Sequence, residues 1–141
     1  MLSLYQDEPN GRIWIGTDGG GVNSLDPVTE EFCHDRSTWG DKVVSITGFT
    51  RESILLSVFS KGLFVYNKEN GKRKPLPIDH PDLKQYIYYS GMAVNIYRDE
   101  PGSVLLLAGH TYRYDIGSQK IRVVNEEEGM EIAGSMNANC A

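Results

Sequence analysis

Apolar residues in this chain fall into short runs that are separated by turn-forming residues. In the first 38 residues the runs lie at 2–6, 12–17, 21–26 and 30–34, and the segments DEPNG, DGG and DPVT separate them. Val, Ile, Tyr, Phe and Trp, which favour strands, dominate the runs, and no segment sustains the 3.6-residue period of an amphipathic helix. The pattern therefore predicts an all-β chain of short strands.

Two of the predicted strands are apolar on both faces. RIWIGT at 12–17 and LFVY at 63–66 do not alternate between apolar and polar residues as a half-buried strand does. Strands without this alternation are usually covered on both sides. We therefore expect each small sheet to lie between two similar sheets.

The strand pattern repeats with a period of 41 residues. The segment IWIGTDGGGVNSLD, which begins at Ile13, aligns without a gap with ILLSVFSKGLFVYN, which begins at Ile54, and the alignment places Gly21 on Gly62. A looser third copy begins at Val94 and has a turn that is two residues shorter. A fixed period of roughly 20 to 50 residues indicates repeated supersecondary units.

Each copy has the size and strand content of one blade of a β-propeller. We predict three four-stranded antiparallel blades at about 1–38, 42–79 and 92–126, followed by the start of a further strand set at about 130–141. An open arc of three blades leaves sheet faces uncovered, so either the other blades of a parent protein or a second copy should complete this partial propeller. A β-sandwich has similar turn spacing and is the alternative, but the gapless repeat favours the propeller.

The first copy carries the most specific motif. GRIWIGTDGGGVNSLDPVTEEF at 11–32 resembles the repeat xIWIGTxxGGLxxYDPxTGxF of the two-component regulator propeller family. The second copy keeps Gly62 and Tyr66 of this pattern, and the third keeps Tyr114. The resemblance implies a propeller from the periplasmic sensor region of a bacterial hybrid two-component sensor, where such propellers receive oligosaccharide signals.

The resemblance also implies a role without catalysis. On this interpretation the chain is a ligand-sensing fragment that recognises carbohydrate, and any histidine kinase activity belongs to parts of the parent protein outside the chain. Two alternatives stay open. One is a propeller that scaffolds a protein partner, and the other is a fragment of a propeller enzyme that acts on polysaccharides, for which His110 with Tyr112 is the only indication.

Composition and charge exclude several kinds of partner. The net charge of -5 argues against nucleic acid and anionic membrane as partners, because both are bound by clustered Lys and Arg. The chain has neither a long apolar run nor a signal-peptide pattern at its N-terminus. Cys33 and Cys140 are expected to be free thiols, although a disulfide between them stays possible.

No cofactor or metal site is expected from the motifs. GTDGGG at 16–21 lacks the spacing of a phosphate-binding loop and is followed by a strand where such a loop needs a helix. Asp18 has no further oxygen ligands at the alternating positions of a calcium loop. We therefore interpret GTDGGG as a hairpin turn, and we place Trp14 in the core.

Aromatic residues in the connections between blades are the candidate ligand contacts. Loops held by a rigid scaffold are where binding residues concentrate, and aromatic rings with nearby carboxylates suit sugars. The connections that lead from an outer to an inner strand share one face of a propeller, so two such clusters could converge. The alternative is that the aromatic side chains pack between blades. The candidates are Trp39, Asp41, Tyr86, Tyr88, Tyr89 and His110.

Overall fold

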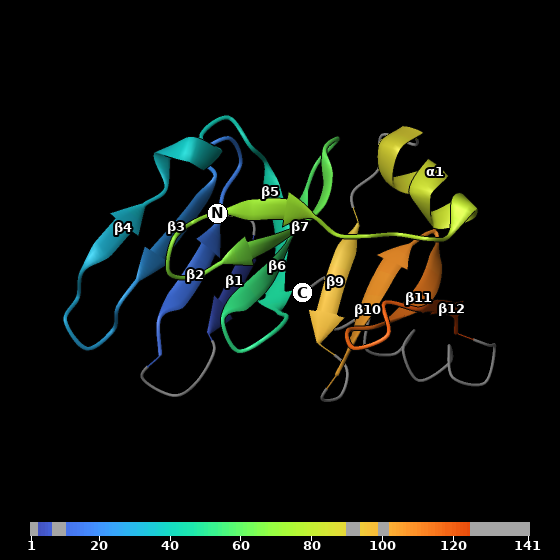
Figure 1. Cartoon of the computed structure of the whole chain (residues 1–141). Helices are drawn as coiled ribbons and strands as arrows, with labels where there is room; N and C mark the ends of the chain where they lie inside the picture. The colour runs from blue at the N-terminus through green and yellow to red at the C-terminus, as the bar shows by residue number, and fades with distance from the viewer. Residues whose placement is uncertain (1–2, 7–10, 90–93, 99–101, 125–141) are drawn as a thin grey trace.

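Three four-stranded antiparallel sheets make up most of the chain (Figure 1). The computed structural model describes residues 3–6, 11–89, 94–98 and 102–124. Blade one contains β1 (Ser3–Gln6), β2 (Ile13–Gly16), β3 (Val22–Leu25) and β4 (Phe32–His34). Blade two contains β5 (Val43–Gly48), β6 (Ser53–Val58), β7 (Gly62–Asn67) and β8 (Arg73–Pro75). Blade three contains β9 (Asn95–Arg98), β10 (Ser103–Ala108), β11 (His110–Asp115) and β12 (Ile121–Val123).

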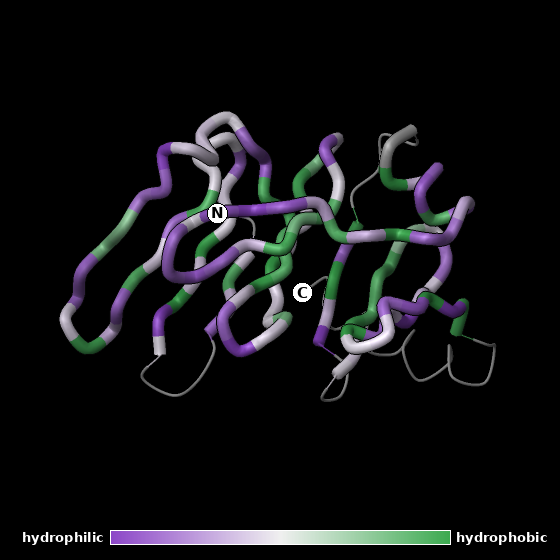
Figure 2. The backbone as a smooth tube through the Cα atoms, in the orientation of Figure 1, coloured by the Kyte–Doolittle hydropathy of each residue, from purple (hydrophilic) through white to green (hydrophobic). Residues whose placement is uncertain are grey.

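Within each blade the strands follow one another in chain order, and the blades stand beside one another. The inner strand β5 contacts both β1 and β9, as the inner strands of neighbouring propeller blades do. One apolar core lies between blades one and two, and a second lies between blades two and three. Figure 2 shows hydrophobic residues along the middle strands and hydrophilic residues at many turns. The prediction of all-β, partial propeller blades is confirmed.

The strand register reproduces the repeat read from the sequence. Ile13 pairs with Leu25 in blade one and Ile54 pairs with Tyr66 in blade two, so the two hairpins have the same length. In blade three Val104 pairs with Tyr114, which makes this hairpin two residues shorter. The shortened third turn is therefore confirmed.

The segment GTDGGG forms the turn between β2 and β3. Gly19 and Gly21 adopt φ angles of 94° and 68°. Their amides donate hydrogen bonds of 3.1 and 3.2 Å to the backbone oxygen of Asp41. The amides that a phosphate would need are thus bound to the connection between blades, and the hairpin interpretation is confirmed. Gly62, the repeat partner of Gly21, also has a positive φ, of 113°.

One connection is helical, against the prediction. Helix α1 (Pro81–Tyr89) lies between blades two and three in the chain, and a single 3-10 turn, η1 (Arg36–Thr38), follows blade one. Leu83 and Ile87, one turn apart, are buried in the core between blades two and three. Because this apolar face extends over little more than one turn, the sequence shows no sustained helical period.

The expectation that every sheet is covered on both faces holds for blade two and is wrong for blade one. All six residues of β6 are buried. In β2, however, Trp14 is buried against blade two while Ile13 and Ile15 are only partly buried. Leu4, on β1, is 54% exposed. Among the described residues no sheet packs on this second face of blade one, which leaves its apolar side chains partly in water.

Some predicted features lie outside the described residues. These are the further strand set at 130–141 and Cys140. Cys33 lies on β4, where it is exposed and free.

Candidate functional site

Trp39 projects from the connection between blades one and two. It is the residue that follows η1, and it is 58% exposed, with the Arg36 guanidinium 5.5 Å from its ring centre. The ring is therefore available at the surface instead of packing between blades. Figure 1 shows that η1 and α1 lie along the same upper edge of the molecule, at opposite ends of it.

Asp41, three residues after the end of η1, has a different environment. Its carboxylate is 2% exposed and binds Lys61 Nζ at 2.5 Å and Arg73 Nη1 at 2.6 Å. Burial by itself raises the pKa of Asp41, but the hydrogen bonds from Lys61 and Arg73 and their charges outweigh it, so the pKa lies below its usual value. Both carboxylate oxygens are occupied. Asp41 joins blade one to blade two, and this arrangement leaves it poorly suited to binding a sugar.

Tyr86 lies at the other end of this edge, beside Gly109, the residue that precedes His110. A Cβ added to Gly109, next to His110, would lie 3.2 Å from the Tyr86 ring. His110 is exposed, and its ring centre lies 6.4 Å from that of Tyr112 without a hydrogen bond between them. His110 and Tyr112 therefore show no geometry for proton transfer. Tyr88 and Tyr89 belong to the last turn of α1, and their side chains lie outside the described part of the chain.

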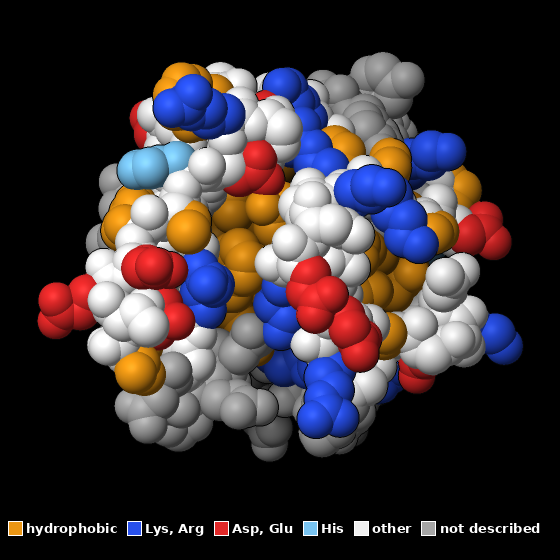
Figure 3. Space-filling view, turned by 60° about the vertical axis from the view of Figure 1, so that its left-hand side comes forward, with side chains coloured by type: hydrophobic (Ala, Val, Ile, Leu, Met, Phe, Trp, Pro, Cys, Tyr) orange, Lys and Arg blue, Asp and Glu red, His pale blue; other side chains and the backbone are white. Residues whose placement is uncertain are grey.

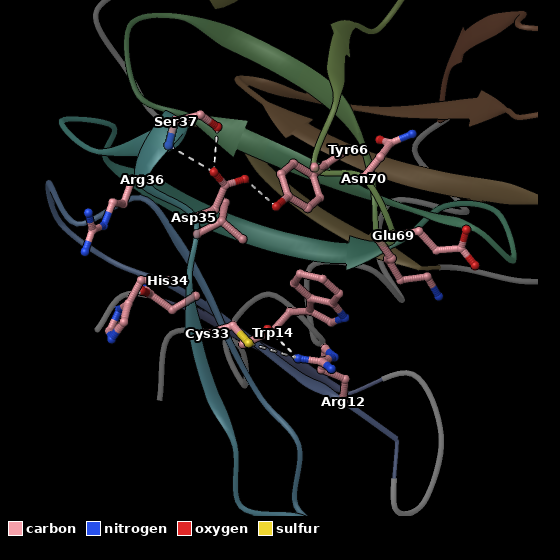
Figure 4. Close-up of a pocket in the computed structure, with 15 residues that line it drawn as sticks. Arg12, Trp14, Cys33, His34, Asp35, Arg36, Ser37, Tyr66, Glu69 and Asn70 are labelled. Carbon is pink, nitrogen blue, oxygen red and sulfur yellow. Dashed lines mark hydrogen bonds between the residues drawn. The ribbon is translucent and has the colours of Figure 1, made fainter.

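A groove between blades one and two was not predicted from the sequence. It measures about 880 Å³ and opens on the outer side of the two sheets. Figure 3 shows a hollow with a hydrophobic floor and a rim of acidic and basic side chains on this side of the molecule. Figure 4 shows the groove in detail. The residues that matter for its chemistry are Arg12, Trp14, Asp35, Tyr66, Glu69 and Asn70.

The groove is closed on one side by a hydrogen bond between the blades. Asp35 caps η1 and accepts hydrogen bonds from the Ser37 amide at 3.0 Å and from Tyr66 Oη at 2.5 Å. Burial by itself raises the pKa of Asp35, but the bonds from Ser37 and Tyr66 outweigh it and lower the pKa. Burial and the Asp35 carboxylate together raise the pKa of Tyr66, which therefore stays protonated and donates.

We expect Tyr66→Phe to lower the free energy of unfolding by about 1–2 kcal/mol, because it leaves one oxygen of a half-buried carboxylate without its donor. Tyr114 occupies the same position of the repeat, but its buried hydroxyl has no partner among the described residues. Tyr114→Phe is thus the matched control, and it should change the free energy of unfolding little or raise it. Urea unfolding measures both variants. Equal losses in the two variants would contradict the assigned role of the Asp35 bond.

Trp14 forms the floor of the groove. It is 4% exposed, and its ring meets the Tyr66 ring edge to face with 5.8 Å between centres. The prediction that Trp14 belongs to the core is confirmed. Its indole Nε1 has no hydrogen-bond partner within the described residues, although it is buried. Arg12 enters the same groove and donates from Nη1 to Ser24 Oγ at 3.0 Å.

Comparison with known proteins identifies the fold. No protein-family model matches the sequence, and no curated protein matches it significantly. Two solved structures of the extracellular domain of BT4673 from B. thetaiotaomicron, assigned once as a one-component and once as a hybrid two-component system, are similar, with TM-scores of 0.59 and 0.58 at 18% and 17% identity. The extracellular domain of BT3049, assigned as a hybrid two-component system of the same organism, gives 0.56 at 15% identity. The chain shares the fold of part of these domains.

The similarity extends over nearly all of the chain and a small part of each neighbour. It covers 87%, 89% and 87% of this chain, but only 16%, 17% and 18% of the three solved structures. The chain therefore spans about one sixth of their length. Membership of the two-component regulator propeller family stays a prediction. In the part of the chain that the structure describes, no helix is long and apolar enough to cross a membrane.

Proposed function

We propose that the chain is part of the extracytoplasmic ligand-sensing region of a two-component sensor, and that its ligand is a carbohydrate. The observation that carries the proposal is the fold shared with the extracellular domains of BT4673 and BT3049 over most of the chain. The exposed Trp39 and His110 and the half-buried Tyr86, on one edge of the blades, support a binding role. Binding there would favour one arrangement of propeller and neighbouring domains, which is how a domain without catalysis changes a signalling state.

A glycan array with the 141-residue chain, followed by calorimetry of the best ligand, tests this function. We expect Trp39→Ala to weaken binding about tenfold or more, because stacked aromatic rings supply much of the binding energy at such sites. Phe32→Ala is the matched control, since Phe32 is 49% exposed but lies on the outer strand β4, away from the connections. Absence of binding on the array, or equal affinity of Trp39→Ala and the unchanged chain, would count against the proposal.

A scaffolding role receives support from a separate observation, the uncovered second face of blade one. Leu4, Ile13 and Ile15 lie there partly exposed, and a propeller covers such a face with another blade. We propose that a blade of the parent protein, or a second copy of this chain, packs on it.

Light scattering tests the packing of a second copy on blade one. The apparent mass of the unchanged chain should rise above the monomer as its concentration increases. Ile15→Glu should shift it back toward the monomer, because a charge on the buried face of an interface is costly. A chain that stays monomeric at every concentration, or an Ile15→Glu variant that associates equally well, would overturn this contact.

A further inference from the structure

Two hydrogen-bond donors meet in the groove between blades one and two without an acceptor between them. Figure 4 shows the indole nitrogen of Trp14 next to the guanidinium group of Arg12. Trp14 is 4% exposed, and its Nε1 has no partner among the described residues. Buried donors are nearly always paired, because an unpaired one loses its bonds to water and gains nothing in return. A ligand that enters the groove can supply the missing acceptor.

Arg12 has capacity for such an acceptor. Its guanidinium carries five N–H bonds. Within the described residues these bonds reach only Ser24 Oγ at 3.0 Å and, weakly, Cys33 Sγ at 3.7 Å, both from Nη1. No carboxylate of this part of the chain forms an ion pair with Arg12. A positive charge beside a buried N–H donor favours an anionic oxygen as the bound group.

The groove lining holds charges of both signs besides Arg12. The Asp35 carboxylate is occupied by Ser37 and Tyr66, and Glu69 lies on the blade-two side of the groove (Figure 4). Arg36 lines the groove together with Arg12, and Lys68, which also lines it, already interacts with another residue. An anion that enters beside Trp14 is attracted by Arg12, whose charge also acts on the exposed carboxylate of Asp26, while Glu69 lies on the opposite wall.

We propose that the groove binds a sugar acid, that is, a polyhydroxylated carboxylate. One carboxylate oxygen accepts hydrogen bonds from Trp14 Nε1 and from the guanidinium of Arg12, which turns aside to admit it. The hydroxyls of the ligand face Glu69 and Asn70 on the opposite wall, where a carboxylate and an amide offer both acceptors and a donor. The volume of about 880 Å³ lies in the range of small-molecule sites and exceeds what a single inorganic ion fills. Trp39 does not line this site, although Arg36 contacts both, and the site does not depend on the sensor function.

Calorimetry with the full 141-residue chain tests the site with three probes: glucuronate, glucose and acetate. Glucuronate presents both the carboxylate and the hydroxyls, and each of the others presents only one of them. We expect glucuronate to bind at least about tenfold more tightly than either, because the single charge-assisted contact and the hydroxyl contacts are then both present. Equal binding of glucose and glucuronate would overturn the role of the carboxylate. Equal binding of acetate and glucuronate would overturn the assignment to a sugar acid, and absence of glucuronate binding would overturn the site.

Two variants test whether glucuronate binds at Trp14 and Arg12. Trp14→Phe keeps an aromatic ring in the core but removes the smaller ring of the indole together with its N–H, and Arg12→Gln removes the charge. Each should weaken glucuronate binding about tenfold, whereas Arg51→Gln, at an exposed arginine outside the groove, should leave it unchanged. In a Trp39→Phe background Trp14 is the single tryptophan, so a change in its fluorescence on adding glucuronate reports the groove alone. Unchanged affinity in both Trp14→Phe and Arg12→Gln, or an unchanged Trp14 signal during binding, would refute the placement of the ligand.

Discussion

Replacing Gly21 with alanine should lower the free energy of unfolding by about 3 kcal/mol, the sum of backbone strain and overpacking. Gly21 has a φ of 68°, which a residue with a Cβ adopts at a cost. An added Cβ would also lie 2.2 Å from Thr38 Oγ1 and 2.4 Å from the Thr38 backbone oxygen. Because a backbone atom cannot turn aside, the hairpin or η1 must shift.

The neighbouring glycine supplies the control for this prediction. Gly19 has a φ of 94°, but an added Cβ would meet nothing within 4 Å. Gly19→Ala should therefore show the backbone strain alone, about 1 kcal/mol. Urea unfolding of the two variants separates strain from contact with Thr38. Similar losses for both variants would show that the close approach of Gly21 to Thr38 contributes nothing.

The hairpin around Gly21 illustrates what the sequence alone could predict. Turn glycines and apolar runs are local signals, and their recurrence at a fixed period made the blades and the shortened third turn visible. Helix α1 was missed because its buried face consists of Leu83 and Ile87, which are too few to set a period. Local sequence patterns thus predict structure when they repeat. A single short helix such as α1 does not repeat, so its pattern is not recognised.

Contacts between blades could not be predicted in the same way. Asp35 and Tyr66 meet across 31 positions of the chain, and Asp41 and Arg73 across 32. Asp41 drew attention as a loop carboxylate beside Trp39, yet only the packing of the blades shows that its charge is neutralised within the protein. For Trp14, sequence reasoning placed the ring in the core correctly, but it could not show that the indole N–H lacks a partner.

Replacing Asp41 with asparagine should lower the free energy of unfolding by about 2 kcal/mol at neutral pH. Removing one member of a buried ion pair leaves its partners uncompensated, and the loss is then typically about 3–5 kcal/mol. The loss is smaller here because the side chain of Lys61 is 55% exposed and can return to water, whereas that of Arg73 is 27% exposed. Asp79→Asn, at an exposed aspartate between β8 and α1, is the control and should have little effect.

Lowering the pH should remove the difference in free energy of unfolding between the unchanged chain and Asp41→Asn. The pKa of Asp41 in the folded chain lies below the usual value of 3.8, so the carboxylate stabilises the fold above that value and loses this effect as the pH falls through the lowered pKa. Asp35, whose pKa is lowered too, contributes to the acid sensitivity of both proteins, so the difference between them isolates Asp41. Urea unfolding over a pH series should show the gap between the unchanged chain and Asp41→Asn closing at acidic pH. A gap that stays constant there would mean that the stabilisation comes from the shape of the side chain, because only the charge of Asp41 titrates.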